Sequence, residues 1–274
     1  MAAKIFLRAW RHYRREGFNS LAFEVDKRIR RLIPFRYRLS YRIKKQKRRW
    51  GPAVITQPGQ IFSINPDLIR YNGPRFDRSK YIGRTKAGEW DKNRSQWGGG
   101  TTYDSFYNRF INDCDWENTQ YYKNAKKKIK NDGYYLGYTD FDSFRTERLP
   151  YLDELFKDIQ SNGYKTQREL GGNNRDTNRH QSVPDSHLHT HEIGCNIARD
   201  GALLFNSGKH RLCIAKILDL DKIPVQIIVR HTEWMKKRKK VACLDDLEDA
   251  TNICDTNLDH PDLQDLLNGK IKIT

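Results

Sequence analysis

One short segment combines the residue types that bind a phosphate group: Ser207, Gly208, Lys209, His210 and Arg211. An apolar run that predicts a strand precedes this segment, and residues 212–218 after it predict a buried helix. A helix that starts directly after a glycine turn presents free backbone N–H groups, and its dipole adds partial positive charge there. Because each cation at that end is unfavourable by up to about 1 kcal/mol, a bound anion would supply the compensation. In the alternative interpretation, the side chains point into solvent or pair with Asp200 or Glu169.

Several predicted elements position this segment. Residues 192–198 predict a strand, Asp200-Gly201 a hairpin turn, and residues 202–205 the returning strand. After the helix, residues 223–229 form a short apolar run that predicts a last core strand. The phosphate-binding residues therefore lie where a predicted strand passes into a predicted helix.

The rest of the body alternates shorter elements with long loops. Residues 61–64 predict a strand and residues 65–67 a turn or helix start. Residues 102–130 predict a helical region that ends at Asn131-Asp132-Gly133, and residues 151–163 an amphipathic helix with a glycine cap. Two polar, glycine-rich stretches predict surface loops, namely residues 73–100 and 171–186.

The basic charge is concentrated at the N-terminus. The 274 residues carry a net charge of +17, and residues 1–50 hold 17 Lys and Arg against three acidic residues. This arm thus carries +14, which leaves +3 for the remaining 224 residues. Residues 5–13 and 21–33 predict amphipathic helices. Residues 35–43 alternate as a strand does, but Phe35, Leu39 and Ile43 also fit a helix, so that choice stays open.

Three interpretations fit the arm at residues 1–50. An amphipathic helix could lie on an anionic membrane surface, with Phe, Trp and Leu inserted and Arg at the headgroups. The same side chains could bind nucleic acid through phosphate neutralisation and aromatic stacking. In the third interpretation the apolar stripes pack on the body of the protein. The basic helix at residues 233–240 would extend any cationic surface.

The segment around the glycine turn resembles the core of the ParB/sulfiredoxin-like superfamily. The signature of that superfamily is a strand, a Gly-x-(His/Arg)-Arg segment, a helix and an "IPV" strand. The matching positions in order are Gly208, His210, Arg211, Ala215, Ile223, Pro224 and Val225. The helix at 151–163 resembles the first box of the superfamily, in which Gly163 and Gln167 match with one extra residue between them. More narrowly, the GEWD segment, the IARDG hairpin and the HPDLQDLL tail resemble an archaeal group of ParB-like proteins.

The resemblance implies an α+β fold: a ParB/sulfiredoxin-like mixed sheet with helical insertions, preceded by a basic helical arm. It implies an arm at 1–50, the core domain at 51–232 with insertions at about 73–150 and 171–190, and a basic-then-acidic helical tail at 233–274. It also implies nucleotide binding at the helix N-terminus, with ATP, ADP or CTP as the cofactor together with Mg²⁺.

Departures from the family distinguish among its activities. Sulfiredoxins have a catalytic cysteine where this chain has Lys209, which disfavours their chemistry. Partition proteins have Glu-Arg-Arg in place of Lys209-His210-Arg211, and they continue into a helix-turn-helix domain, whereas 44 residues follow Arg230 here. The His-Arg pair is closer to the kinase-like branch. In a phosphotransferase, Lys209, His210 and Arg211 would stabilise the transferring phosphoryl group, and Glu169 would orient or deprotonate the acceptor.

Other patterns are less informative. His187, His189 and His191 alternate, but no acidic or cysteine ligand at suitable spacing completes a metal site, so no metal site is predicted. Cys195 and Cys213 fall within apolar patterns and predict buried thiols. The odd cysteine number, the missing secretion signal and the lack of a long apolar run favour the cytoplasm, with peripheral membrane attachment as an option.

Two hypotheses follow for function. The first is a nucleotide-binding protein of this fold that acts as a phosphotransferase on a small molecule or glycan near the membrane. Its catalytic residues would be Glu169 and His210, and its phosphate-binding residues Gln167 and Ser207 to Arg211. The alternative is a DNA-binding ParB-like regulator or nuclease-type protein with a nucleotide switch. Both assign the anionic partner, membrane or nucleic acid, to residues 1–50.

Overall fold

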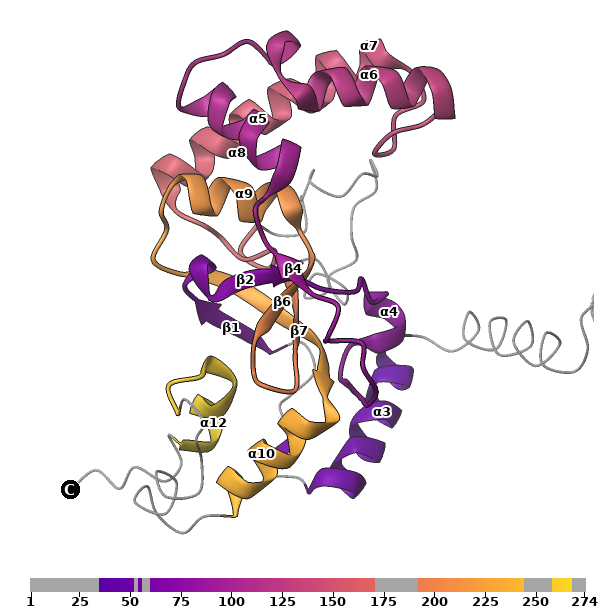
Figure 1. Ribbon diagram of the computed structural model, residues 1–274, viewed down its shortest axis with the longest axis vertical. Helices are drawn as coiled ribbons and strands as arrows, with labels where there is room; N and C mark the ends of the chain where they lie inside the picture. Colours follow the sequence, from indigo (N-terminus) through magenta and orange to yellow (C-terminus); the bar gives the residue numbers. More distant parts are fainter. Residues whose placement is uncertain (1–34, 52–53, 56–59, 171–191, 244–257, 268–274) are drawn as a thin grey trace, which may run out of the picture. The chain divides into compact units, whose positions relative to one another are not determined.

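The chain divides into two compact units, Met1–Lys45 and Gln46–Thr274. The computed structural model describes residues 35–51, 54–55, 60–170, 192–243 and 258–267 (Figure 1). The helices predicted at 5–13 and 21–33 lie outside these ranges. The segment that fitted both a strand and a helix is helical, because α3 (Phe35–Trp50) runs through it. The four-residue spacing of its apolar residues and the proline just before its first turn both favour a helix.

A seven-stranded mixed sheet forms the centre of the second unit. The strand order is β1-β7-β5-β6-β2-β4, and β3 also pairs with β7. Strand β7 is parallel to β5 and β3 but antiparallel to β1, and β6 is antiparallel to β5 but parallel to β2. The strands are β1 (Ile61–Ile64), β2 (Ile69–Asn72), β3 (Arg84–Lys86), β4 (Ser95–Gln96), β5 (Ile193–Ile197), β6 (Leu203–Ser207) and β7 (Ile223–His231). The prediction of an α+β fold with a mixed sheet is confirmed.

Helices lie at two places around the sheet. One group is next to α9, which follows the turn at Gly208, and the other comes after the end of β7. Figure 1 shows α5, α6 and α8 on the far side of α9 from the sheet, and α10 and α12 near the other end. In the described residues, the helices that follow α3 are α4 (Arg78–Tyr81), α5 (Gly100–Phe110), α6 (Gln120–Asp132), α7 (Phe141–Ser143), α8 (Leu149–Asn162), α9 (Lys209–Ile217), α10 (Thr232–Ala242) and α12 (Gln264–Leu267). Short turns add η2 (Pro66–Leu68), η3 (Trp116–Asn118), the π-helical η4 (Phe144–Arg148) and η6 (Pro261–Leu263).

Helix α9 is buried between two hydrophobic clusters. Leu212 and Ala215 pack with the sheet, whereas Cys213 and Ile214 pack with α5, α6 and α8. The sequence of α9 therefore shows an apolar run rather than one apolar stripe, as expected for a helix covered on two sides. Cys195 on β5 and Cys213 on α9 are both buried free thiols, which confirms their prediction as core residues.

The sequence predicted most element positions around the turn correctly. Strand β5, the hairpin at Gly201, strand β6, helix α9 and strand β7 all lie where they were expected. Helix α8 ends at Gly163 and helix α6 at Gly133, both with positive φ, as the glycine caps predicted. Strand β6 runs two residues farther than expected, so the turn before α9 is reduced to a single residue.

One prediction about residues 73–130 was wrong, and another needs finer division. Residues 73–100 are not a loop throughout, because they contain α4, β3 and β4. These elements have four, three and two residues, which is too short to leave a periodic pattern. The helical region at 102–130 is divided into α5, η3 and α6. Asp113, with φ of 51°, lies in the break between α5 and η3, and aspartate is among the few residues that adopt this conformation readily.

None of the helices in the described part of the chain combines the length and apolar character needed to cross a bilayer.

Candidate anion-binding site at the head of helix α9

The turn between β6 and α9 is a single glycine in the left-handed conformation. Gly208 is the N-cap of α9, with φ of 93° and ψ of 36°. A Cβ at this position would lie 3.1 Å from the Cα of Ile193 on β5, so the backbone of α9 starts close against the sheet. No side chain caps the helix. The N–H groups of the first turn, which have no partner within a helix, are therefore not satisfied by a cap.

The three cations of the first turn diverge. Lys209 extends toward the start of α5, where its Nζ lies 3.9 Å from the Cβ position of Gly100. Among the described residues, Lys209 makes no ion pair. Helix α5 also begins without a side-chain cap, and Gly99 and Gly100 both have positive φ. Two uncapped helix N-termini are thus linked by one ammonium group, an arrangement that favours anions at both.

His210 points into the aromatic cluster formed by α5 and α6. Its ring stacks on Phe106 with centroids 5.6 Å apart. Its Nδ1 lies 3.0 Å from Nη2 of Arg148, and its Nε2 lies 3.1 Å from the hydroxyl of Tyr121. A guanidinium can only donate, so Nδ1 accepts and the imidazole is neutral with its proton on Nε2. His210 therefore acts here as a neutral link from α9 to α6 and η4, and the positive charge at this point is that of Arg148.

Arg211 faces the sheet. It is 6% exposed, and its Nη1 lies 3.8 Å from Oε2 of Glu192, which is completely buried. The other carboxylate oxygen of Glu192 accepts a hydrogen bond of 2.7 Å from the backbone N–H of Gln167. Burial raises the pKa of the Glu192 carboxyl, while Gln167, Arg211 and Arg78 act in the opposite direction. The structure thus brings Gln167 and Arg211 together through Glu192.

Arg78, at the start of α4, completes the group. Its guanidinium donates to Oγ of Ser207 from Nε at 3.1 Å and from Nη2 at 2.7 Å, and Nη2 also donates to the carbonyl of Glu192. Its Nη1 donates to Oε1 of Gln226 at 3.3 Å. Burial and then repulsion by Arg211 lower the pKa of Arg78 to about 10. Two guanidinium groups, those of Arg78 and Arg211, thus lie beside the single carboxylate of Glu192 near the head of α9.

Two buried amides beside these cations have polar atoms without a hydrogen-bond partner among the described residues. They are Oε1 of Gln167, with the side chain 1% exposed, and Nε2 of Gln226, which is fully buried. Buried polar atoms are nearly always paired with protein, water or a ligand. Nε2 of Gln226 can only donate, so it fits an acceptor such as a phosphate oxygen or a water molecule.

Glu169 has a local role in the structure. It is exposed, and its Oε2 accepts hydrogen bonds of 2.7 Å from the backbone N–H and the hydroxyl of Thr166. Those hydrogen bonds lower the pKa of Glu169. The charge of Glu169 contributes to the raised pKa of Glu192. The carboxylate of Glu169 itself closes the turn at Thr166. Asp200 pairs with Arg94 at 2.7 Å, so it is not a partner of the α9 cations.

The sequence did not point to Arg78, Glu192 or Arg148 as site residues. Arg78 lies in the stretch predicted as a loop, and Arg148 lies at the end of an irregular π-helical turn. Glu192 begins the strand region, where one acidic residue before an apolar run is ordinary. Only the hydrogen bonds over 62 to 148 residues of sequence identify them.

Within the described ranges, no group of three or more His, Cys, Asp or Glu side chains is placed to hold a metal ion. The alternating histidines His187, His189 and His191 lie outside those ranges.

No family model, curated protein or solved structure matches the chain. The resemblance to the ParB/sulfiredoxin-like superfamily therefore stays a prediction, and the interpretation of the site depends on its own residues.

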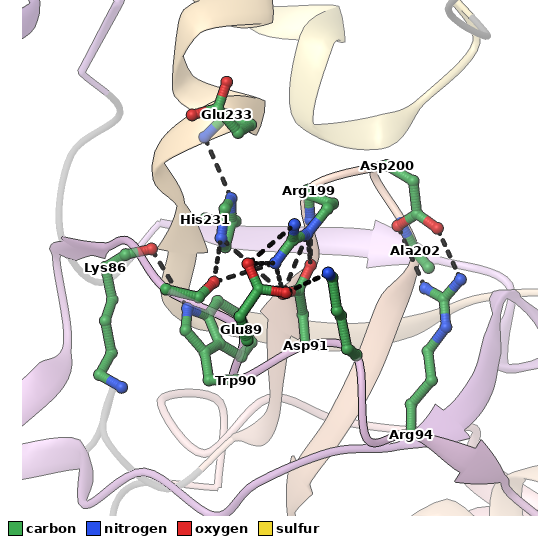
Figure 2. Close-up of polar contacts among 12 residues, drawn as sticks. Lys86, Glu89, Trp90, Asp91, Arg94, Arg199, Asp200, Ala202, His231 and Glu233 are labelled. Atoms are coloured by element: carbon green, nitrogen blue, oxygen red, sulfur yellow. Dashed lines mark hydrogen bonds and ion pairs between the residues drawn. The ribbon is translucent and has the colours of Figure 1, made fainter.

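A second polar network joins the GEWD segment to the β5–β6 hairpin (Figure 2). Asp91 is 3% exposed and accepts from the backbone N–H of Arg199 at 2.9 Å and from its Nε and Nη2 at 2.9 and 2.8 Å. Nη2 of Arg199 also donates to the carbonyl of Gly88 at 3.0 Å, and Nη1 donates to Glu89 at 3.4 Å. His231 Nε2 lies 2.9 Å from the same carbonyl of Gly88. Because these groups satisfy one another, the network is best explained as a structural clamp.

Replacing Asp91 by asparagine should lower the free energy of unfolding by about 2 kcal/mol, because charge-assisted hydrogen bonds to the Arg199 guanidinium are lost. Burial opposes ionisation of Asp91, yet the hydrogen bonds from Arg199 lower its pKa to about 2. Urea unfolding followed by circular dichroism measures the effect. Asp200→Asn is the matched control, since its pair with Arg94 in Figure 2 is exposed and should contribute less than about 1 kcal/mol. Equal losses in both variants would contradict the clamp.

Proposed function

We propose that the protein binds the phosphate groups of a nucleotide at the head of α9. The observation that carries this proposal is the uncapped N-terminus of α9, which starts at a left-handed glycine with Arg78 and Arg211 beside it. Backbone N–H groups, the helix dipole and nearby guanidinium groups together make the usual protein site for phosphate. Ser207, Gly208, Lys209 and His210 are all partly exposed, so an anion can approach from solvent.

The neighbouring start of α5 favours more than one phosphate group. Lys209 lies between the two uncapped helix N-termini and can neutralise charge at either. A nucleoside diphosphate or triphosphate carries several charges along a short chain, which suits a site with cations on two elements. Mg²⁺ would be held mainly by the phosphates, as it usually is, since the described side chains form no cluster for it.

In a phosphotransfer reaction, His210 and Glu169 would have other roles than the sequence alone predicted. Arg148 holds His210 neutral, so His210 would position Arg148 and Tyr121 rather than stabilise charge. Of the two carboxylates, Glu192 is the one that contacts Arg211 and Gln167, whereas Glu169 is hydrogen-bonded to Thr166. Glu192 would therefore position Arg211 and the Gln167 backbone, because its carboxylate is completely buried and contacts both.

Thermal shift with ATP, ADP, CTP, GTP, pyrophosphate and inorganic phosphate, with and without Mg²⁺, tests phosphate binding. A ligand at 100 times its Kd should stabilise the native state by about 2.7 kcal/mol and raise the melting temperature by several degrees. Lys209→Gln should weaken the binding of the tightest of these ligands by about tenfold, because one charge-assisted contact is lost. Lys222→Gln is the matched control, because Lys222 is an exposed lysine that follows α9 and changes the net charge equally.

The outcomes separate clearly. Stabilisation by a nucleotide that falls in Lys209→Gln and is retained in Lys222→Gln supports the site. Stabilisation that falls equally in both variants would show only general attraction of anions to a basic chain. No shift with any of the six compounds at millimolar concentration would exclude the proposal.

A further inference from the structure

Two runs of cations from distant parts of the sequence meet in the second unit. The last turn of α3 and the exposed sides of α10 supply them, and together they are called the basic face here. Its members are Lys47, Arg48, Arg49, Lys236, Lys237, Lys239 and Lys240. All except Lys237 are exposed.

A small apolar cluster holds the two helices together. Trp50 at the end of α3 packs with Met235 of α10 and with Val54, and all three are buried. The indole N–H of Trp50 donates to Oε1 of Gln46 at 3.1 Å and to the hydroxyl of Thr85 on β3 at 3.4 Å. The end of α3 is thus fixed to β3 as well as to α10. The cations at the end of α3 and those of α10 therefore belong to two helices that share one buried apolar contact.

Arg49 connects the apolar cluster to the charged surface. Its guanidinium lies over the ring of Trp50, 5.0 Å from the centroid. Lys236 follows Met235 by one position and Lys239 follows it by four positions along α10, and both lysines are exposed. Residues four apart share a helix face, so Met235 and Lys239 project on the same side.

Within helices α3 and α10 themselves, few of the charges of the basic face are balanced. Helix α3 has no acidic residue, and in α10 the one carboxylate is Glu233, which pairs with Lys236 at 2.9 Å. Cations in the last turn of a helix interact favourably with the dipole, by about 0.3–1 kcal/mol each. The favourable interaction with the helix dipole can explain one or two of the cations on each helix. The seven cations of the basic face lie within two short segments, so they also repel one another. A polyanion would relieve this repulsion.

We propose that the basic face binds the phosphate backbone of duplex nucleic acid. An anionic membrane is the other large polyanion, but surface attachment to membranes usually combines charge with inserted apolar side chains. The large apolar side chains near the face, Trp50, Trp234, Met235 and Val241, are all buried. No large apolar side chain is exposed in α10 or in the end of α3 from Gln46 to Trp50. Nucleic acid needs only cations at phosphate spacing.

The test measures binding of the full chain to a 20-base-pair DNA duplex of mixed sequence at a series of salt concentrations. Each phosphate contact contributes about 0.9 to the slope of log K against log salt. The triple variant Lys236→Gln, Lys239→Gln, Lys240→Gln should lower that slope by about 2–3, with at least tenfold weaker binding near physiological salt. The control is Lys126→Gln, Lys127→Gln, Lys130→Gln, because these exposed lysines lie on α6 and remove the same charge.

Three results would overturn the proposal. The first is an equal loss of slope in the α10 and α6 variants, which would show unlocalised attraction. The second is binding to vesicles of phosphatidylserine and phosphatidylcholine that the α10 variant loses while duplex binding is unchanged. The third is weak binding by the charge-conserving variant Lys236→Arg, Lys239→Arg, Lys240→Arg. That last variant, with circular dichroism of each protein, distinguishes loss of charge from loss of folding.

Discussion

Asp262→Asn is expected to lower the free energy of unfolding by about 3–5 kcal/mol, the usual effect of removing one partner from a buried ionic group. Asp262 is 1% exposed and lies between two guanidinium groups. Arg230 donates to it from Nε at 3.0 Å and from Nη2 at 2.5 Å, and Nη1 of Arg238 lies 3.3 Å away. The indole N–H of Trp234 adds a hydrogen bond of 2.8 Å. Without the carboxylate, two mostly buried cations would lose their central counterion.

Chemical unfolding in urea at pH 7 measures this effect. Asp265→Asn provides a graded control from the same segment, because Asp265 pairs with Arg238 but its side chain is 25% exposed. That control should lose about 1 kcal/mol, since a partly hydrated pair contributes less. A loss below 1 kcal/mol in Asp262→Asn would show that Arg230 and Arg238 find other counterions, and the assignment of Asp262 as their centre would be wrong.

The pH dependence of stability gives an independent measurement of the same group. Burial alone would raise the pKa of Asp262, but the charges of Arg230 and Arg238 lower it to about 2. An aspartate in the unfolded chain titrates near 3.9. Because the folded-state pKa is the lower one, the stabilisation is complete above about pH 5 and is lost as the pH falls toward 2. The Asp262→Asn variant should therefore lose less stability than the wild type over that interval.

The local part of the candidate site could be predicted from the sequence. Gly208 between an apolar strand and an apolar helix has one good structural explanation, and the structure places it at that junction. Lys209, His210 and Arg211 follow in the first turn of α9 because they follow in the chain. Hydrophobic periodicity is a local signal, so it predicts elements and their order well.

The partners of those three side chains could not be predicted in the same way. Whether a cation at a helix start faces solvent, an aromatic cluster or a carboxylate depends on which segments pack around it. His210 meets Arg148 and Tyr121 because η4 and α6 pack over α9, and Arg211 meets Glu192 because β5 pairs beside β6. Neither contact leaves a trace in residue spacing. The neutral state of His210 is likewise a consequence of tertiary packing.

The short elements were missed for a related reason. Strand β3 pairs with β7 through only Arg84, Thr85 and Lys86, which form no hydrophobic alternation. Their strand conformation is fixed by the backbone of β7, a central strand with every residue buried. Edge pairing of this kind depends on the partner strand more than on intrinsic preference.

Gly208→Ala is expected to lower the free energy of unfolding by about 2–5 kcal/mol, and it tests the geometry on which the proposed site depends. A left-handed conformation costs a residue with a Cβ about 1–2 kcal/mol. The new Cβ would also lie 3.1 Å from the backbone of Ile193, and crowding of this kind adds about 1–3 kcal/mol.

Gly133→Ala separates these two effects, because Gly133 has φ of 69° and nothing lies within 4 Å of its Cβ position. The control should lose only the conformational part, about 1–2 kcal/mol. Urea unfolding compares the two variants, and thermal shift with the nucleotide that binds most tightly shows whether the head of α9 has moved. If Gly208→Ala costs no more than Gly133→Ala, the turn does not press against β5. If stability falls as expected but nucleotide binding is unchanged, the phosphate site lies elsewhere, because a displaced first turn cannot keep its N–H groups aimed at the same anion.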